Sequence, residues 1–344
     1  MRRADIGRGP RSRLARAPGA YDGAMGDGEA QGSTAEHDND VEVDVLDAGT
    51  AMLTALRAVG ERMSQLEPAV LADEPDAVHQ LRTYVRRLRS LLAAYGPLFD
   101  VSVATGLRRR YRTFGRELGV VRDLEVRVQV AERALAEAAE EGVIADAEER
   151  EAVQARLIDA ERASHALAHA RLAERERSAR ADARRDALQV FLDDPPRTAL
   201  AAQPAKQVLG ALLELEARHA VRRSERLDDA SDTETLHAVR KAGRRLRYAA
   251  EAVSKEPLEL FDGRAHALAS VGDDLHDLLG DHRDEVLFAE HVRRMAAHAA
   301  HDGAPAAAFE RLAVAADARA ASQLKHLPKV VRDLRSATRA WESR

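Results

Sequence analysis

Two segments of the chain repeat one pattern of histidine, arginine and leucine, and this repeat constrains the fold more than any other feature. The segments are VHQLRTYVRRLRSLL at residues 78–92 and LHAVRKAGRRLRYAA at residues 236–250, and both contain H-x-x-R-x-x-x-R-R-L-R. A second shared pattern, L-G-x-x-R-D, follows each copy, as LGVVRD at 118–123 and as LGDHRD at 279–284. Because both patterns recur in the same order, the sequence predicts two related halves that arose by internal duplication.

The remainder of the sequence predicts an all-α fold. Ala, Arg, Glu and Leu dominate, aromatic residues make up only 3% of the chain, and no segment alternates for long with the period of a strand. Residues 143–194 contain neither Gly nor Pro, which predicts one very long helix or two nearly collinear ones, stabilised by i,i+4 ion pairs. The other helices are expected, from periodicity and Gly or Pro boundaries, near 48–72, 76–95, 101–140, 205–229, 233–254, 258–280, 282–301, 304–325 and 327–343.

We therefore expect two pseudo-symmetric helical bundles, an N-terminal half at 47–192 and a C-terminal half at 205–344. The segment 193–204, DDPPRTALAAQP, is the clearest break and is expected to be a linker. Residues 1–46 are rich in Gly, Ala and charge without periodicity, so a disordered tail is expected there. No apolar run is long enough to span a membrane, and the N-terminus lacks the apolar core of a secretory signal, so we expect a cytoplasmic protein without a membrane partner.

On a helix, each repeated segment carries a basic stripe beside an apolar one. At about 100° per residue, the histidine and three arginines of each copy fall on one narrow arc next to a row of Val and Leu residues. The apolar row is expected to be buried, so the basic stripe lies at the border of the core. The stripes are His79, Arg82, Arg86 and Arg89 in the first copy and His237, Arg240, Arg244 and Arg247 in the second, which Lys241 and Tyr248 extend.

Neither stripe contains an acid, although the chain has 58 acidic and 53 basic residues and a formal net charge of −5. Like charges at this helical spacing repel one another, so the stripes require partners from elsewhere. One interpretation is internal pairing with an acidic stripe of matching spacing, formed by Asp274, Asp277, Asp281 and Asp284. The other is a bound polyanion, because arginine forks match phosphate oxygens. A third acid-free basic run lies in the first half and favours the polyanion: Arg108, Arg109, Arg110, Arg112 and Arg116.

From about residue 48 to the C-terminus, the sequence resembles the CHAD family, the conserved histidine α-helical domain. The resemblance lies in VHQLRTYVRRLRSLL, LGVVRDLEV, LHAVRKAGRRLRYAAE and LHDLLGDHRDEV. It implies two four-helix bundles related by pseudo-twofold symmetry, and a basic surface that binds inorganic polyphosphate, with association to polyphosphate granules in some members. Gly243 lies in the middle of the second motif helix and is expected to weaken that turn slightly.

The family's histidine and basic positions correspond to the motif residues of both copies, and the third basic run and the extended edge of the second stripe complete the expected site. The expected polyphosphate-binding residues are His79, Arg82, Arg86, Arg87, Arg89, Arg108, Arg109, Arg112, Arg116, His237, Arg240, Lys241, Arg244, Arg245, Arg247 and Tyr248. The expected function is non-catalytic binding, without a metal or other cofactor.

Three alternatives stay open from the sequence alone. A metal-dependent phosphoanhydride hydrolase would need carboxylates around a metal, for which the acidic stripe is a candidate. A nucleic-acid-binding protein would share the electrostatics, although no basic segment is interleaved with aromatic residues that could stack on bases. A scaffold without a ligand is the third. The chain has no cysteine, which excludes disulfides, thiolate zinc sites and cysteine nucleophiles.

Overall fold

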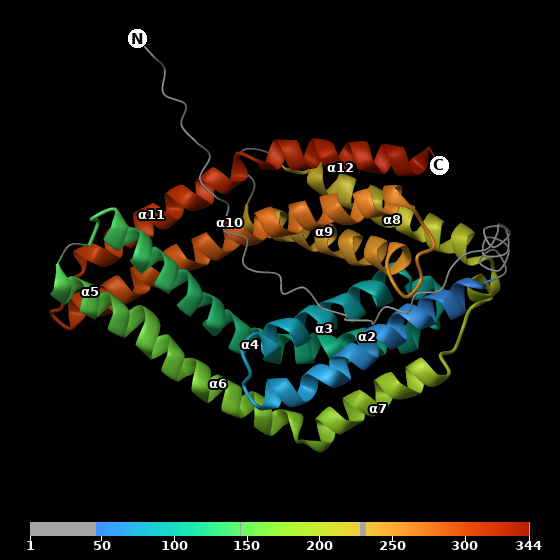
Figure 1. The fold of residues 1–344 in the computed structure, drawn as a ribbon, viewed down its shortest axis with the longest axis horizontal. Coiled ribbons are helices and arrows are strands. Elements are labelled where there is room, and N and C mark those ends of the chain that lie inside the picture. Colours follow the sequence, from blue (N-terminus) through green and yellow to red (C-terminus); the bar gives the residue numbers. More distant parts are fainter. Residues whose placement is uncertain (1–45, 145, 228–231, 344) are drawn as a thin grey trace, which may run out of the picture.

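The computed structural model describes residues 46–144, 146–227 and 232–343, and within these ranges the extended structure is limited to two isolated β-bridges (Figure 1). The predicted all-α class is confirmed. The expected disordered tail at 1–46 lies outside the described residues, apart from Leu46. No helix in the described ranges is both long and apolar enough to cross a membrane.

The two halves present their helices in the same order. Each begins with a medium helix, continues with the helix that carries the repeated motif, and then forms a very long helix of 40 or 39 residues, α4 or α10. The N-terminal half comprises α2 (Ala48–Leu71), α3 (Ala77–Ala94), α4 (Val101–Glu140), α5 (Ala147–Gln154), a π-helical turn (Ala155–Asp159), α6 (Ala160–Glu176) and α7 (Ala179–Asp193). The C-terminal half comprises α8 (Ala205–Ser224), α9 (Thr233–Ser254), α10 (Gly263–His301), α11 (Ala307–Leu324) and α12 (Leu327–Glu342). This order is what a duplication would produce, and the duplication itself stays a prediction.

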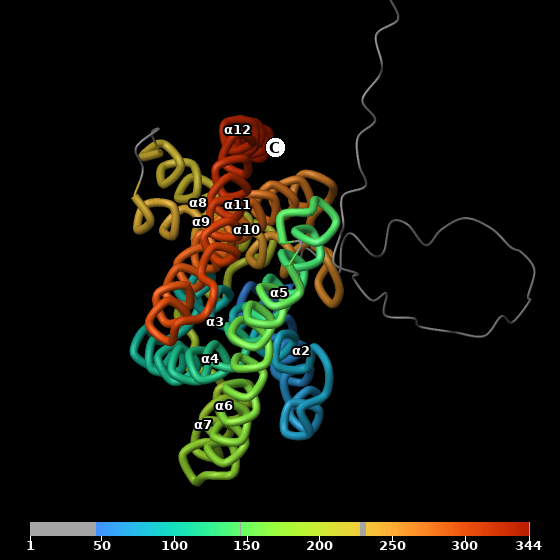
Figure 2. The backbone as a smooth tube through the Cα atoms, turned by 90° about the vertical axis from the view of Figure 1, so that its left-hand side faces the viewer, coloured from blue at the N-terminus to red at the C-terminus, as the bar shows by residue number. Residues whose placement is uncertain are grey.

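The motif helices α3 and α9 lie at the centre, where the two halves meet. Each buries its apolar row, with Leu88 and Leu246 fully buried, as their helical spacing predicts. Helix α3 packs against α4 of its own half and against α9 of the other half, and α9 packs along α10. In Figure 2, α3 and α4 lie below α8 and α9 on the left side of the molecule. The basic stripes of both copies therefore approach one another across this boundary.

Gly243 allows α9 and α10 to approach closely. A Cβ on Gly243 would lie 3.0 Å from the carbonyl oxygen of Gly272, and a Cβ on Gly272 would lie 2.8 Å from the backbone nitrogen of Arg247. The contact at Gly272 is too short for a Cβ and that at Gly243 is unusually tight, so the helices cross at a pair of glycines. The residue that sequence alone marks as a weak point in the helix is thus a requirement of packing.

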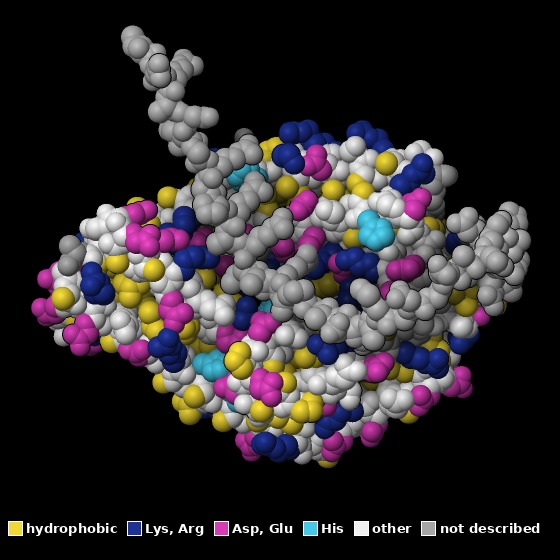
Figure 3. Space-filling view, viewed as in Figure 1, with side chains coloured by type: hydrophobic (Ala, Val, Ile, Leu, Met, Phe, Trp, Pro, Cys, Tyr) yellow, Lys and Arg dark blue, Asp and Glu magenta, His cyan; other side chains and the backbone are white. Residues whose placement is uncertain are grey.

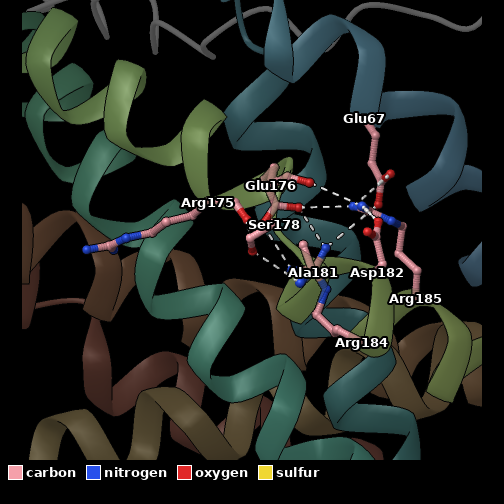
Figure 4. A network of polar contacts seen from close by, with 8 residues as sticks. All are labelled: Glu67, Arg175, Glu176, Ser178, Ala181, Asp182, Arg184 and Arg185. Carbon is pink, nitrogen blue, oxygen red and sulfur yellow. Dashed lines mark hydrogen bonds and ion pairs between the residues drawn. The ribbon is translucent and has the colours of Figure 1, made fainter.

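The prediction for residues 143–194, one very long helix or two nearly collinear ones, is wrong. Helix α6 ends at Glu176, and α7 begins at Ala179 and runs at a clear angle to α6 (Figure 1). Ser178 is the N-cap of α7, because its hydroxyl oxygen accepts a hydrogen bond from the backbone N–H of Ala181 at 3.4 Å (Figure 4). A serine that caps a helix can begin a new direction without any Gly or Pro.

The predicted break between helices at 258–280 and 282–301 is also wrong, since α10 runs unbroken from Gly263 to His301. Gly280 lies inside this helix and has a packing role. A Cβ on Gly280 would lie 3.0 Å from a terminal nitrogen of Arg240, so the missing side chain makes room for that guanidinium. Gly280 therefore marks a contact with α9 and not the end of a helix.

Candidate anion-binding groove

Helices α3, α4 and α9 enclose a cavity of about 840 Å³ between the two halves, here called the central groove. Asp123 is the one acid among its lining residues in the described part of the chain. By contrast, acidic and basic side chains are interspersed over the face seen in Figure 3. The basic and histidine lining of the central groove comprises Arg82, Arg86, Arg89, Arg108, Arg109, Arg112, Arg116, His237, Arg240, Lys241, Arg244, Arg245 and Arg283.

A smaller cavity of about 190 Å³ continues the central groove toward α10. The two cavities share Asp123 and four arginines, Arg82, Arg86, Arg240 and Arg283. The smaller one is also lined by His79 and by three further arginines that the expected site did not include: Arg122, Arg127 and Arg294. The structure thus brings thirteen of the sixteen expected residues to the two connected cavities, namely all except Arg87, Arg247 and Tyr248.

Arg86 and Arg244 occupy equivalent positions in the two motif copies, and neither has a carboxylate within 4 Å among the described residues. Burial and repulsion by Arg240 lower the pKa of Arg86. Burial and repulsion by Arg86 lower the pKa of Arg244 to about 9. The Nε of Arg244 is buried without a hydrogen-bond partner in the described structure. Two guanidinium groups that repel each other are therefore held without a carboxylate in direct contact, which is unfavourable until an anion joins them.

The shared pattern L-G-x-x-R-D supports one arginine of each motif helix. A Cβ on Gly119 would lie 3.4 Å from the Arg82 guanidinium, as one on Gly280 would crowd Arg240, so each glycine gives an arginine space to lie against the long helix. Asp123 lies 3.6 Å from Arg82, and Asp284 interacts electrostatically with Arg240. These aspartates attract one arginine of each motif helix, and they leave most of the positive charge of the central groove without a carboxylate partner.

The acidic stripe of α10 does not neutralise the basic stripes as a whole. Burial raises the pKa of Asp284 and of Asp281; Asp284 lines the smaller cavity, and Asp281 lines neither of the two cavities. The one close ion pair between a basic stripe and this part of α10 joins Arg247 to Asp273, among the pairs between described residues. Internal ion pairs therefore involve Arg82 and Arg247 of the stripes. Among the described residues they leave Arg86 and Arg244 without a carboxylate partner.

Arg87, Arg247 and Tyr248 lie away from the central groove. Arg87 and Arg247 both form ion pairs with Glu251, the latter at 3.3 Å, and Lys255 joins the same carboxylate at 3.0 Å. The guanidinium carbons of Arg87 and Arg247 lie 5.6 and 5.5 Å from the centre of the Tyr248 ring. Since Arg87 is on α3 and Glu251 is on α9, this cluster connects the two halves.

Three histidines lie close to the arginines of the two cavities, and burial lowers the pKa of each. The pKa of His237 falls to about 4, with repulsion from Lys241 as the next cause. Burial and repulsion from Arg122 also lower the pKa of His79. His276 is deeply buried beneath Arg240 and Arg244 with a strongly lowered pKa, and its backbone carbonyl accepts a hydrogen bond from Arg240 Nε at 3.3 Å. These rings are uncharged at neutral pH without a ligand.

Sequence reasoning missed Arg122 and Arg283 although a signal for both was present. Each is the arginine of L-G-x-x-R-D, and the equivalent positions of the two halves line connected cavities. Arg127 and Arg294 carry no comparable signal in the sequence. Among the described residues, no group of three or more histidine, cysteine, aspartate and glutamate side chains is arranged to hold a metal ion.

A family model described as CHAD domain matches residues 54–293. Two proteins of Mycobacterium tuberculosis, Uncharacterized protein MT2285 (strain CDC 1551 / Oshkosh) and Uncharacterized protein Rv2226 (strain ATCC 25618 / H37Rv), are each 30% identical over 246 residues, which cover 70% of this chain and 45% of theirs. The chain thus matches less than half the length of these relatives.

Two solved structures share the fold. PptA from Streptomyces chartreusis has a TM-score of 0.63 at 22% identity, covering 87% of this chain and 100% of its own. The CHAD domain from the plant Ricinus communis has a TM-score of 0.60 at 21% identity, covering 86% of this chain and 93% of its own.

Proposed function

This chain belongs to the CHAD-domain family, and on that basis we propose that it binds inorganic polyphosphate in the central groove without catalysing a reaction. Binding of this kind would suit a protein that attaches to polyphosphate granules. The observation that carries the proposal is the juxtaposition of Arg86 and Arg244, two half-buried arginines that line the central groove without a carboxylate within 4 Å among the described residues.

An anion that bridges Arg86 and Arg244 would remove the repulsion between them and supply the missing hydrogen-bond acceptors. Phosphate suits this role, because its oxygens accept paired hydrogen bonds from the arginine fork and the guanidinium stays charged at every physiological pH. The basic lining continues along α4 through Arg108, Arg112 and Arg116. A single phosphate could not reach all these positions, so a flexible chain of phosphates is the better fit.

Nucleic acid fits the central groove less well. Its lining includes no aromatic side chain in the described part of the chain, whereas proteins that bind single strands usually stack bases on aromatic rings. The basic residues offer phosphate contacts from helix faces and no evident set of groups for reading base edges. A polyanion without bases uses the same arginines and requires nothing more.

The absence of catalysis is part of the proposal. Arginine does not exchange protons at neutral pH, so the side chains that dominate the groove can hold phosphate but cannot act as general acids or bases. His237 of the central groove and His79 of the smaller cavity would act as further hydrogen-bonding groups. A metal-dependent hydrolase would instead need carboxylates positioned around the bound chain.

Equilibrium binding of fluorescently labelled long-chain polyphosphate tests this function. We expect affinity that falls steeply with salt concentration, because bound phosphates release their counterions. Excess double-stranded DNA should fail to displace the label, and incubation with Mg²⁺ or Mn²⁺ should release no orthophosphate. Displacement by DNA at equal phosphate concentration would favour nucleic-acid binding, and phosphate release that depends on the metal would make the protein a hydrolase.

A further inference from the structure

A second basic cavity, of about 580 Å³, lies on another side of α4, between this helix and the turn that joins α6 to α7. Its arginines come from both sides of the cavity. Arg109 and Arg110 belong to α4, while Arg175 and Arg180 flank the α6–α7 turn. This α4–α7 cavity therefore depends on the change of direction at Ser178, which the sequence did not predict.

The positive charge of the α4–α7 cavity is largely unpaired. None of Arg109, Arg110, Arg175 and Arg180 forms an ion pair within 4 Å with a described residue. In Figure 4 the side chain of Arg175 points away from the neighbouring ion-pair cluster.

Two acids line the α4–α7 cavity among the described residues, and one of them is already paired. Glu176 accepts two hydrogen bonds from Arg184, at 2.9 and 2.7 Å, and lies 3.5 Å from Arg185. Its carboxylate is thereby neutralised and held inside the protein. Glu117 is the other acid that lines the cavity. The exposed arginines are thus left to attract an anion from solvent.

Arg109 lines both the α4–α7 cavity and the central groove. Successive residues of α4 turn by about 100°, so the run from Arg108 to Arg112 presents guanidinium groups around one side of the helix, from one cavity to the other. A ligand that leaves the central groove past Arg109 therefore meets further arginines directly.

We propose that the α4–α7 cavity is a second anion subsite, which holds phosphate groups of a polyphosphate chain that continues from the central groove around α4. This inference rests on the proposed function and extends it to a preference for long chains. An α-helix with its side chains is about 10–12 Å across. A chain that occupies both cavities must therefore be longer than one that occupies the central groove alone.

The test uses Arg110→Gln/Arg180→Gln, which removes two charges from the α4–α7 cavity and none from the central groove. Both side chains are exposed and without an ion pair, so the fold should tolerate the change. Arg335→Gln/Arg339→Gln on α12 is the matched control, because it removes two exposed, unpaired charges from a helix at the opposite edge of the molecule from α7 (Figure 1). The probes are tripolyphosphate and long-chain polyphosphate, titrated into each full-length variant.

We expect the affinity of Arg110→Gln/Arg180→Gln for the long chain to fall roughly tenfold, with a shallower salt dependence, because two charge-assisted contacts are lost. Its affinity for tripolyphosphate should match that of the wild type, and the α12 control should bind both probes normally. Glu117→Gln, which removes the remaining acid, should bind the long chain more tightly.

Unchanged long-chain affinity in Arg110→Gln/Arg180→Gln would overturn the second subsite, and it would leave the proposed function intact if the wild type binds polyphosphate. An equal loss for both probes would also overturn it, because the cavity would then not distinguish chain length. Failure of the wild type to bind either probe would instead refute the proposed function itself.

Discussion

Arg244 and Arg245 are neighbours on α9, and the structure predicts opposite effects on stability when each is replaced by methionine. Arg244 has no carboxylate within 4 Å in the described structure, whereas Arg245 pairs with Glu216, a carboxylate whose side chain is only 11% exposed. Methionine keeps much of the length and apolar stem of arginine and removes its charge. The exchange therefore isolates the contribution of charge at two adjacent positions.

The magnitude for Arg244 follows from its pKa, which falls from the ordinary arginine value to about 9 in the folded protein. Each pKa unit corresponds to about 1.4 kcal/mol between protonation states, so the penalty for the charged form is at most about 5 kcal/mol. Salt and water reach part of this side chain and screen the repulsion. We therefore expect Arg244→Met to raise the free energy of unfolding by about 1–2 kcal/mol, while it weakens polyphosphate binding.

Arg245→Met should lower the free energy of unfolding by about 2 kcal/mol, because Glu216 would be left buried and without its closest partner. Urea denaturation in phosphate-free, low-salt buffer measures both changes, and added salt should narrow the difference between Arg244→Met and the wild type. If Arg244→Met loses stability as Arg245→Met does, then Arg244 has stabilising partners within the protein, and the reasoning about uncompensated charge is wrong.

Two other predictions concern packing and pH. Gly272→Ala should lower the free energy of unfolding by about 2–4 kcal/mol, because the new Cβ would lie 2.8 Å from the backbone of α9. Gly106→Ala is the control, since its Cβ would meet nothing within 4 Å, and it should raise the free energy of unfolding by up to about 1 kcal/mol. Equal effects of the two changes in thermal denaturation would contradict the close crossing of α9 and α10. The pKa of His237 is about 4 in the free protein and 6.5 ordinarily, so its contribution to stability is lost as pH falls from 6.5 toward 4. Bound phosphate would raise this pKa, so affinity should increase between pH 7.5 and 5.5 in the wild type more than in His237→Gln, and parallel pH profiles would remove His237 from the site.

The sequence predicted the helical class and the basic stripes because both follow from local spacing along one helix. Helical periodicity placed Arg82, Arg86 and Arg240 on one face of their helices, and the structure places all three in the central groove. A periodic pattern gives the direction of a side chain around its own helix. It does not give the neighbour that the side chain meets.

That limit explains the residues for which sequence reasoning and structure differ. Arg247 shares a stripe with Arg244, yet it turns to Asp273 and Glu251, which lie on α10 and on its own helix. Gly280 resembles the end of a helix and instead accommodates Arg240 from α9. Ser178 starts a new helix with only its hydroxyl as a signal. Each of these features depends on a contact that is remote in sequence or on a single capping bond.

Calorimetric titration of long-chain polyphosphate into the wild type and into Arg86→Glu/Arg244→Glu, at two salt concentrations, measures whether these two arginines hold the ligand. Circular dichroism must first establish that the variant keeps its helical content. We expect tight, salt-sensitive binding by the wild type and a loss of affinity of at least about 100-fold in the variant, since two attractive contacts become repulsive ones. Equal binding by both proteins would show that Arg86 and Arg244 do not contact the ligand, and would contradict the account.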